Sequence, residues 1–200
     1  MSTSATRLSV DDWIQAGFEI IAEEGLKAIK IDRLCKRLGV TKGSFYWHFT
    51  DLGAYLGALA EAWGTAIDGI RAEWVELEQL EPRERLTRMM MSLIDDRHWM
   101  LERAMREWAR TDPAVAKKIE LSDRWSYRMI AKVFRDAGYA DEEAGTRARI
   151  VFYTGVGFVH VGGGPPDDPR AAAERQRFID LVLPLPGNGG NGVSARDSPQ

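Results

Sequence analysis

Apolar residues recur at helical spacing along most of the chain. In the first fifty residues they stand three and four positions apart, which places them on one face of a helix. With glycines at the turns, this pattern predicts three helices, over about residues 10–24, 31–38 and 42–49. Strand alternation of apolar and polar residues appears nowhere. The sequence therefore predicts an all-α fold.

Six further helices are expected in the rest of the chain. A sustained apolar stripe over residues 52–77 predicts a helix about 40 Å long. The other five are expected from Pro82, through residues 99–108, from Asp112-Pro113 to Gly138, from a cap at Asp141, and from a cap at Asp168-Pro169. The glycine-proline run at 162–166 is expected to be a linker, and the tail at 184–200 to be disordered. About nine helices result.

The composition is typical of a globular protein, with 44% hydrophobic and 28% charged residues. This composition excludes wholesale disorder and a collagen. A membrane protein is also excluded, because the most apolar run, residues 150–161, is shorter than the about 20 residues that cross a bilayer. The single cysteine, Cys35, excludes an internal disulfide, and the first residues lack an export signal. A cytoplasmic location is expected.

Charge is unevenly distributed although the net charge is only −3. Residues 27–49 hold six bases and one acid, whereas residues 51–85 hold eight acids and three bases. This asymmetry indicates a small basic head on an acidic body, or simply two solvated faces. Any nucleic-acid site must be local, because the whole chain offers no basic field.

Two short helices joined by a turn at Gly39 are typical of a helix-turn-helix unit, whose core the first helix completes. Phe45 and Phe49 form the inward face of the third helix, and the Thr41 hydroxyl is expected to cap it. The outward side carries side chains suited to phosphate oxygens or base edges. These residues are Lys42, Gly43, Ser44, Tyr46 and Trp47. Alternatively, the two aromatic rings pack on a neighbouring helix.

The segments Ile31–Leu34 and Gly39–Phe49 resemble the DNA-binding head of the tetracycline-repressor (TetR) family of transcriptional regulators. The resemblance covers roughly residues 7–67 and implies that the third helix enters the major groove. Two positions depart from the family pattern: Lys30 stands where Ser or Thr is common, and Leu52 where Lys is common. The candidate DNA-binding residues are Lys30, Thr41, Lys42, Gly43, Ser44, Tyr46, Trp47 and His48.

The resemblance also implies two domains and a homodimer. Residues 7–67 would form the head, with the helix-turn-helix at about 30–49, and residues 68–183 a body that binds a ligand. The last two helices would pair with those of a second subunit. Dimerisation has an independent physical reason, because two heads about one DNA turn apart read a palindrome and gain affinity together.

Aromatic and methionine side chains in the body are candidates for lining a cavity that accepts an apolar or aromatic molecule. Apolar residues at helical spacing are more often plain core, so each is only a candidate. The candidates are Met89, Trp99, Met100, Trp108, Trp125 and Phe152.

The predicted function is a sequence-specific DNA-binding transcriptional regulator, in the simplest case a repressor released from a palindromic operator by a small apolar or aromatic effector. An enzyme is disfavoured, and no metal or cofactor is expected, because the histidines are isolated and no phosphate-binding loop is present. Three alternatives stay open: activation, regulation without a ligand, and a helical adaptor whose basic head contacts proteins.

Overall fold

The structure is a computed structural model that describes residues 8–92, 96–161 and 169–184. Over these residues all regular structure is helical, which confirms the predicted all-α fold. The α-helices are α1 (Val10–Glu24), α2 (Ile31–Leu38), α3 (Lys42–His48), α4 (Leu52–Glu76), α5 (Pro82–Met91), α6 (Asp96–Ala109), α7 (Pro113–Asp136), α8 (Asp141–Val161) and α9 (Pro169–Val182). The predicted linker, the Asp168 cap and all of the predicted tail beyond Pro184 lie outside the described residues.

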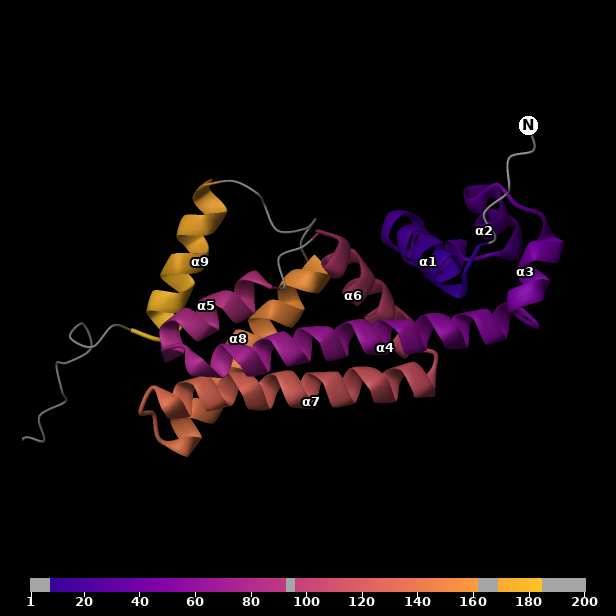
Figure 1. The fold of residues 1–200 in the computed structure, drawn as a ribbon. Helices are drawn as coiled ribbons and strands as arrows, with labels where there is room; N and C mark the ends of the chain where they lie inside the picture. Colours follow the sequence, from indigo (N-terminus) through magenta and orange to yellow (C-terminus); the bar gives the residue numbers. More distant parts are fainter. Residues whose placement is uncertain (1–7, 93–95, 162–168, 185–200) are drawn as a thin grey trace, which may run out of the picture.

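The long helix α4 connects the two ends of the molecule. Figure 1 shows α1, α2 and α3 gathered at one end of α4, while α7 runs alongside its other part and α9 stands at the opposite end. Contacts between α4 and α7, and between α7 and α8, hold the body together.

The helix ends follow from local chemistry. The Ser9 hydroxyl accepts from the Asp12 backbone N–H (3.2 Å) while the Asp12 carboxylate accepts from the Ser9 N–H (2.7 Å), so α1 begins with a capping box. Gly25 and Gly39 follow α1 and α2 with φ of 83° and 68°, values that glycine adopts without a steric cost. The predicted starts and stops of these helices are thereby confirmed.

Two predicted caps are wrong. Thr41 is the N-cap residue of α3, but its side chain makes no capping hydrogen bond there. Its backbone has the extended conformation of an N-cap residue. The Ser44 N–H donates to the Thr41 carbonyl instead of the hydroxyl (3.1 Å). Asp141 does not precede α8 but is its first residue, where its negative charge still favours the helix N-terminus.

An aromatic cluster forms the core of the head. The ring of Trp13 on α1 meets Phe45 edge-on at 5.4 Å between ring centroids and Phe49 edge-on at 6.3 Å. Tyr55 on α4 packs against both phenylalanines and donates its buried hydroxyl to the Trp13 carbonyl (2.9 Å). Burial raises the pKa of Tyr55, so its hydroxyl stays protonated as the donor. These contacts fix α3 against α1 and α4.

Helix α6 packs on both the head and the body. Leu101 and Ala104 lie against the aromatic head core, whereas Met105 and Trp108 are buried in a second cluster with Trp63 of α4 and residues of α7. A third cluster, around Trp74 and Phe134, forms the far end of the body. The head is therefore joined to the body through both α4 and α6.

Gly17→Ala is expected to destabilise the protein by about 1–3 kcal/mol, the usual effect of overpacking a core. A Cβ at this position would clash with the Tyr55 hydroxyl and lie 3.0 Å from Leu59 Cδ1, and both side chains are fully buried. Urea unfolding measures the change. The matched control is Gly57→Ala, which has open space around its Cβ and should stabilise the protein by about 1 kcal/mol through helix propensity alone.

The double variant Gly17→Ala, Tyr55→Phe tests the assigned clash. Removing the hydroxyl relieves the closest contact, so the double variant should be more stable than the sum of the two single changes predicts. Strict additivity would contradict the packing described for this core.

Candidate functional site

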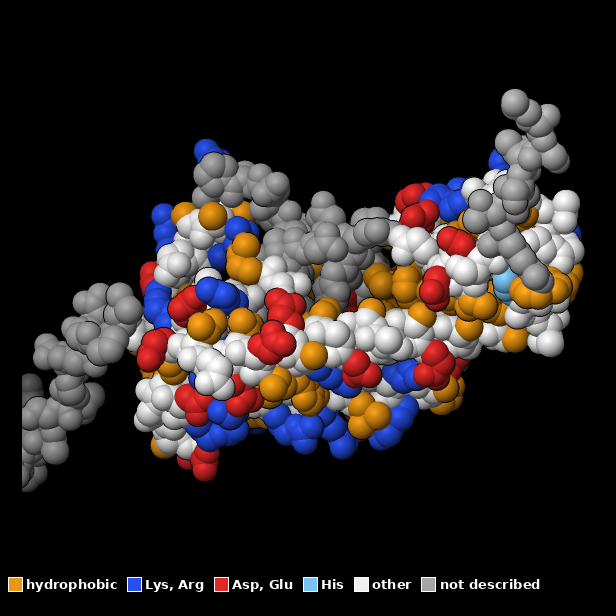
Figure 2. Space-filling model, in the orientation of Figure 1, with side chains coloured by type: hydrophobic (Ala, Val, Ile, Leu, Met, Phe, Trp, Pro, Cys, Tyr) orange, Lys and Arg blue, Asp and Glu red, His pale blue; other side chains and the backbone are white. Residues whose placement is uncertain are grey.

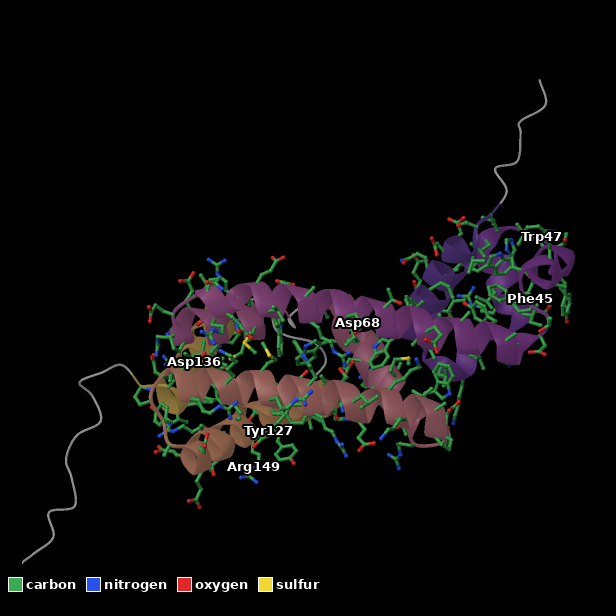
Figure 3. The ribbon with its side chains drawn as sticks, turned by 60° about the horizontal axis from the view of Figure 1, so that its bottom comes forward. Phe45, Trp47, Asp68, Tyr127, Asp136 and Arg149 are labelled. Atoms are coloured by element: carbon green, nitrogen blue, oxygen red, sulfur yellow. The ribbon has the colours of Figure 1, made fainter. Side chains whose placement is uncertain are left out.

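The outward side of α3 is exposed at the tip of the head (Figure 3). Tyr46 and Trp47 are 55% and 63% exposed, so the alternative in which both rings pack inside on a neighbouring helix does not hold. The Trp47 ring meets the His48 ring edge-on at 4.6 Å, and His48 is half-buried. Among the other candidates, exposed positions are Lys30, Thr41, Lys42 and Gly43, and Ser44 is half-buried. Except for Lys30, which precedes α2, these residues share one short helix and its cap.

Lys42 is tied to α2 by an ion pair. Its Nζ lies 2.7 Å from Oδ1 of Asp32, and both side chains are largely exposed. The hydrogen bond to Asp32, followed by the attraction of its charge, raises the pKa of Lys42, so the ammonium is charged at neutral pH. A surface pair of this kind contributes little to stability and can open for another anion.

The positive charge of the head is partly neutralised from within. Arg33 pairs with Glu24, and Arg37 pairs with Glu23 and, at 3.2 Å, with Glu19, all three acids lying on α1. These pairs fasten α2 to α1. The remaining bases, Lys27, Lys30 and Lys36, have no ion pair within the described part of the chain.

The body is not uniformly acidic, which corrects the sequence-based picture. Helix α7 holds six basic and three acidic residues. Figure 2 shows Lys and Arg side chains along α7 at the lower edge of the body, with acidic side chains above them. The acidic stretch found in the sequence, residues 51–85, covers only α4 and the start of α5.

A cavity of about 360 Å³ lies inside the body, between α4, α5, α6, α7, α8 and α9. Four of the six candidates line it, namely Met89, Trp99, Trp125 and Phe152. Trp108 does not line the cavity, because it is buried between α4, α6 and α7 in the second cluster. The side chain of Met100 lies outside the described residues.

Sequence reasoning missed the polar part of the cavity wall. Arg106 donates to both carboxylate oxygens of Asp123, at 3.0 and 2.6 Å, and lies 2.8 Å from Oε1 of Glu102. Burial alone would lower the pKa of Arg106, but the bonds to Asp123 and the charge of Glu102 outweigh it and raise the pKa. Arg71 also lines the cavity, with its guanidinium 5.6 Å over the Trp125 ring and an Nη1 bond to Asp68 of 2.7 Å.

Large apolar side chains are also exposed on α8 and α9. Tyr153 is 64% exposed, and Ile150, Phe158 and Val161 on the same helix are exposed as well. Leu181 continues this surface on α9. Such exposure on two adjacent helices is typical of an interface.

Two other kinds of site receive no support from the described residues. They contain no group of three His, Cys, Asp or Glu side chains arranged to hold a metal ion. Within the same ranges, no helix has both the length and the apolar character needed to cross a membrane.

The N-terminal segment matches known regulatory proteins. The family model described as bacterial regulatory proteins, tetR family, matches residues 14–51. The tetracycline repressor class A from transposon 1721 of Escherichia coli is 39% identical over 57 residues, which are 28% of this chain and 26% of that protein. The class G repressor of Vibrio anguillarum is 39% identical over an equally long segment, 27% of its length. The sequence similarity thus spans about a quarter of these relatives.

Solved structures match nearly the whole chain. A transcriptional regulator from a Rhodococcus species superposes with a TM-score of 0.65 at 24% identity, over 88% of this chain and 92% of that one. A TetR regulator from Legionella pneumophila gives a TM-score of 0.69 at 13% identity, over 91% and 99% of the two chains. At these identities the structures show a shared fold. Residues 14–51 thus match the TetR family of bacterial regulatory proteins, and the chain shares its fold with solved regulators.

Proposed function

We propose that the protein is a transcriptional regulator that binds duplex DNA with α3. The observation that carries this proposal is the exposed side of α3, where Lys42, Tyr46 and Trp47 project from a helix held by a buried aromatic core. Donors and flat rings on a rigid short helix suit the phosphates and base edges of a major groove. We further propose that residues 7–67 act as the DNA-binding domain and residues 68–183 as the ligand-binding and dimerisation domain.

The proposed active form is a homodimer that binds a palindromic operator. One α3 helix reads only a few base pairs, and a second head adds affinity when both sit on adjacent turns of DNA. The exposed apolar residues of α8 and α9 support pairing of these two helices with their counterparts in a second copy. The body would thus set the distance between the two heads.

We propose that the cavity holds a small-molecule effector that releases the repressor from its operator. Helix α6 supports this coupling, because Trp99 and Arg106 line the cavity while Leu101 and Ala104 pack on the head core. An effector that favours one position of α6 would shift the heads away from the spacing that DNA requires. The coupling is reciprocal, so operator DNA would weaken effector binding by the same factor.

Lys42→Ala should weaken binding to a duplex selected from a random pool and reduce its logarithmic salt slope by about one, because one phosphate contact is lost. The melting temperature should hardly change, since the pair with Asp32 is exposed. Fluorescence anisotropy over a salt series measures both quantities. The matched control is Lys117→Ala on α7, which has the same 60% side-chain exposure and also pairs with one acid. Equal DNA affinity in the two variants would place the reading face elsewhere, and a wild-type protein that binds no duplex at low salt would favour the adaptor.

Tyr153→Glu should convert the dimer to a monomer and weaken operator binding together, because it places a charge on the apolar surface of α8. Analytical ultracentrifugation and anisotropy on the same samples measure the two effects. Leu121→Glu is the control, since Leu121 is also exposed, at 50%, but lies on α7. A Tyr153→Glu protein that stays dimeric would remove α8 from the interface.

A further inference from the structure

One part of the wall of the body cavity carries an excess of negative charge. The cluster of Glu102, Arg106 and Asp123 holds two carboxylates and one guanidinium. The other charged lining residues are Arg71, which pairs with Asp68 outside the cavity, and Glu174 and Arg175 on α9, so acids and bases balance over the whole lining. The cluster itself has a formal charge of −1, a state that low-dielectric surroundings penalise.

One oxygen of this cluster is left without a partner. Glu102 Oε1 lies 2.8 Å from Arg106, whereas Oε2 is buried and has no hydrogen-bond partner among the described residues. Both Nη groups of Arg106 donate hydrogen bonds to Asp123. Its buried Nε also lacks an acceptor, but an anion placed there would meet two carboxylates against one guanidinium. The balance of charge favours a positive group beside Glu102.

The remaining walls are aromatic. Trp74 and Trp125 lie 5.6 Å apart between ring centroids, and Trp99 and Phe158 lie 6.3 Å apart. The faces of such rings attract cations, and this cavity already shows it, because the Arg71 guanidinium lies 5.6 Å over Trp125. Aromatic rings next to an excess carboxylate form a site for an organic cation.

We infer that the effector is an organic cation with an apolar or aromatic body, whose positive group lies against Glu102. This inference rests on the proposed role of the cavity as effector site and specifies the chemistry of its ligand. Aromatic rings surround the body of the ligand, while the net charge of the cluster disfavours a carboxylate or phosphate beside Glu102. Arg106 acts as a positioning residue that holds both acids.

A charge series of one shape tests the inference on the free protein. The probes are benzyltrimethylammonium, its neutral carbon isostere neopentylbenzene, and the anion phenylmethanesulfonate. Titrations followed by tryptophan fluorescence and ligand-observed NMR should show the cation bound about tenfold more tightly than the neutral isostere, with the anion weakest. Equal binding of cation and isostere, tighter binding of the anion, or no binding of any probe at millimolar concentration would overturn the inference.

Glu102→Gln should lower the affinity for benzyltrimethylammonium about tenfold and leave that for neopentylbenzene within about twofold. The variant should fold, because Arg106 keeps both bonds to Asp123. Glu107→Gln is the matched control, since it removes the same charge from an exposed position of α6 outside the cavity. An equal loss for both probes in Glu102→Gln would show a merely structural role and contradict the inference.

DNA binding separates this inference from the proposed function. The wild-type protein is titrated with the selected duplex as well as with the probes, because α3 and the cavity lie in different parts of the chain. A protein that binds duplex DNA but prefers the neutral probe would refute the inference that the effector is a cation and leave the DNA-binding function standing. A protein that binds the cation but no duplex would refute the DNA-binding function and leave the cavity chemistry standing.

Discussion

The position of α3 depends on the packing of Trp13 against Phe45 and Phe49. Both phenylalanines lie on the same side of the α3 segment, so burying them beside Trp13 leaves Trp47 on the opposite side, toward solvent. Tyr55 closes the cluster from α4 and bonds to the Trp13 backbone. A helix of seven residues is too short to be stable alone, so tertiary packing supplies its order. The exposure of Trp47 is therefore a consequence of the burial of Phe45 and Phe49.

Helix α6 places ligand chemistry and head packing on one rigid element. Its cavity side carries Trp99, Glu102 and Arg106, and its other sides carry Ala104, which packs on the head core, and Met105, which is buried in the second cluster. Because close-packed cores resist gradual deformation, a displacement of α6 by a bound molecule must be passed on to the clusters that it touches. This gives the proposed repression mechanism a physical path, since α1 of the head is a direct neighbour of α6.

The helices and their turns could be predicted from sequence, because periodicity, Gly25 and Gly39 act locally. The wall of the cavity could not. Glu102 and Arg106 stand four apart, which in a sequence is typical of a surface pair, and Asp123 reaches them only because α6 and α7 pack together. Trp108 shows the opposite error, since its type fits a ligand cavity and its place on α6 puts it in the core.

The charge of the head also depends on tertiary pairing. Six bases in residues 27–49 indicate a strong local field, yet Arg33 and Arg37 are spent on glutamates of α1 and Lys42 is shared with Asp32. With three of these six bases in internal ion pairs, the head gains less affinity from phosphates than its sequence suggests. In the proposed homodimer, DNA recognition then relies more on the shape and donors of α3, and on two heads acting together. Under this proposal, the internal ion pairs make the spacing of the two heads, which the body sets, decisive for DNA binding.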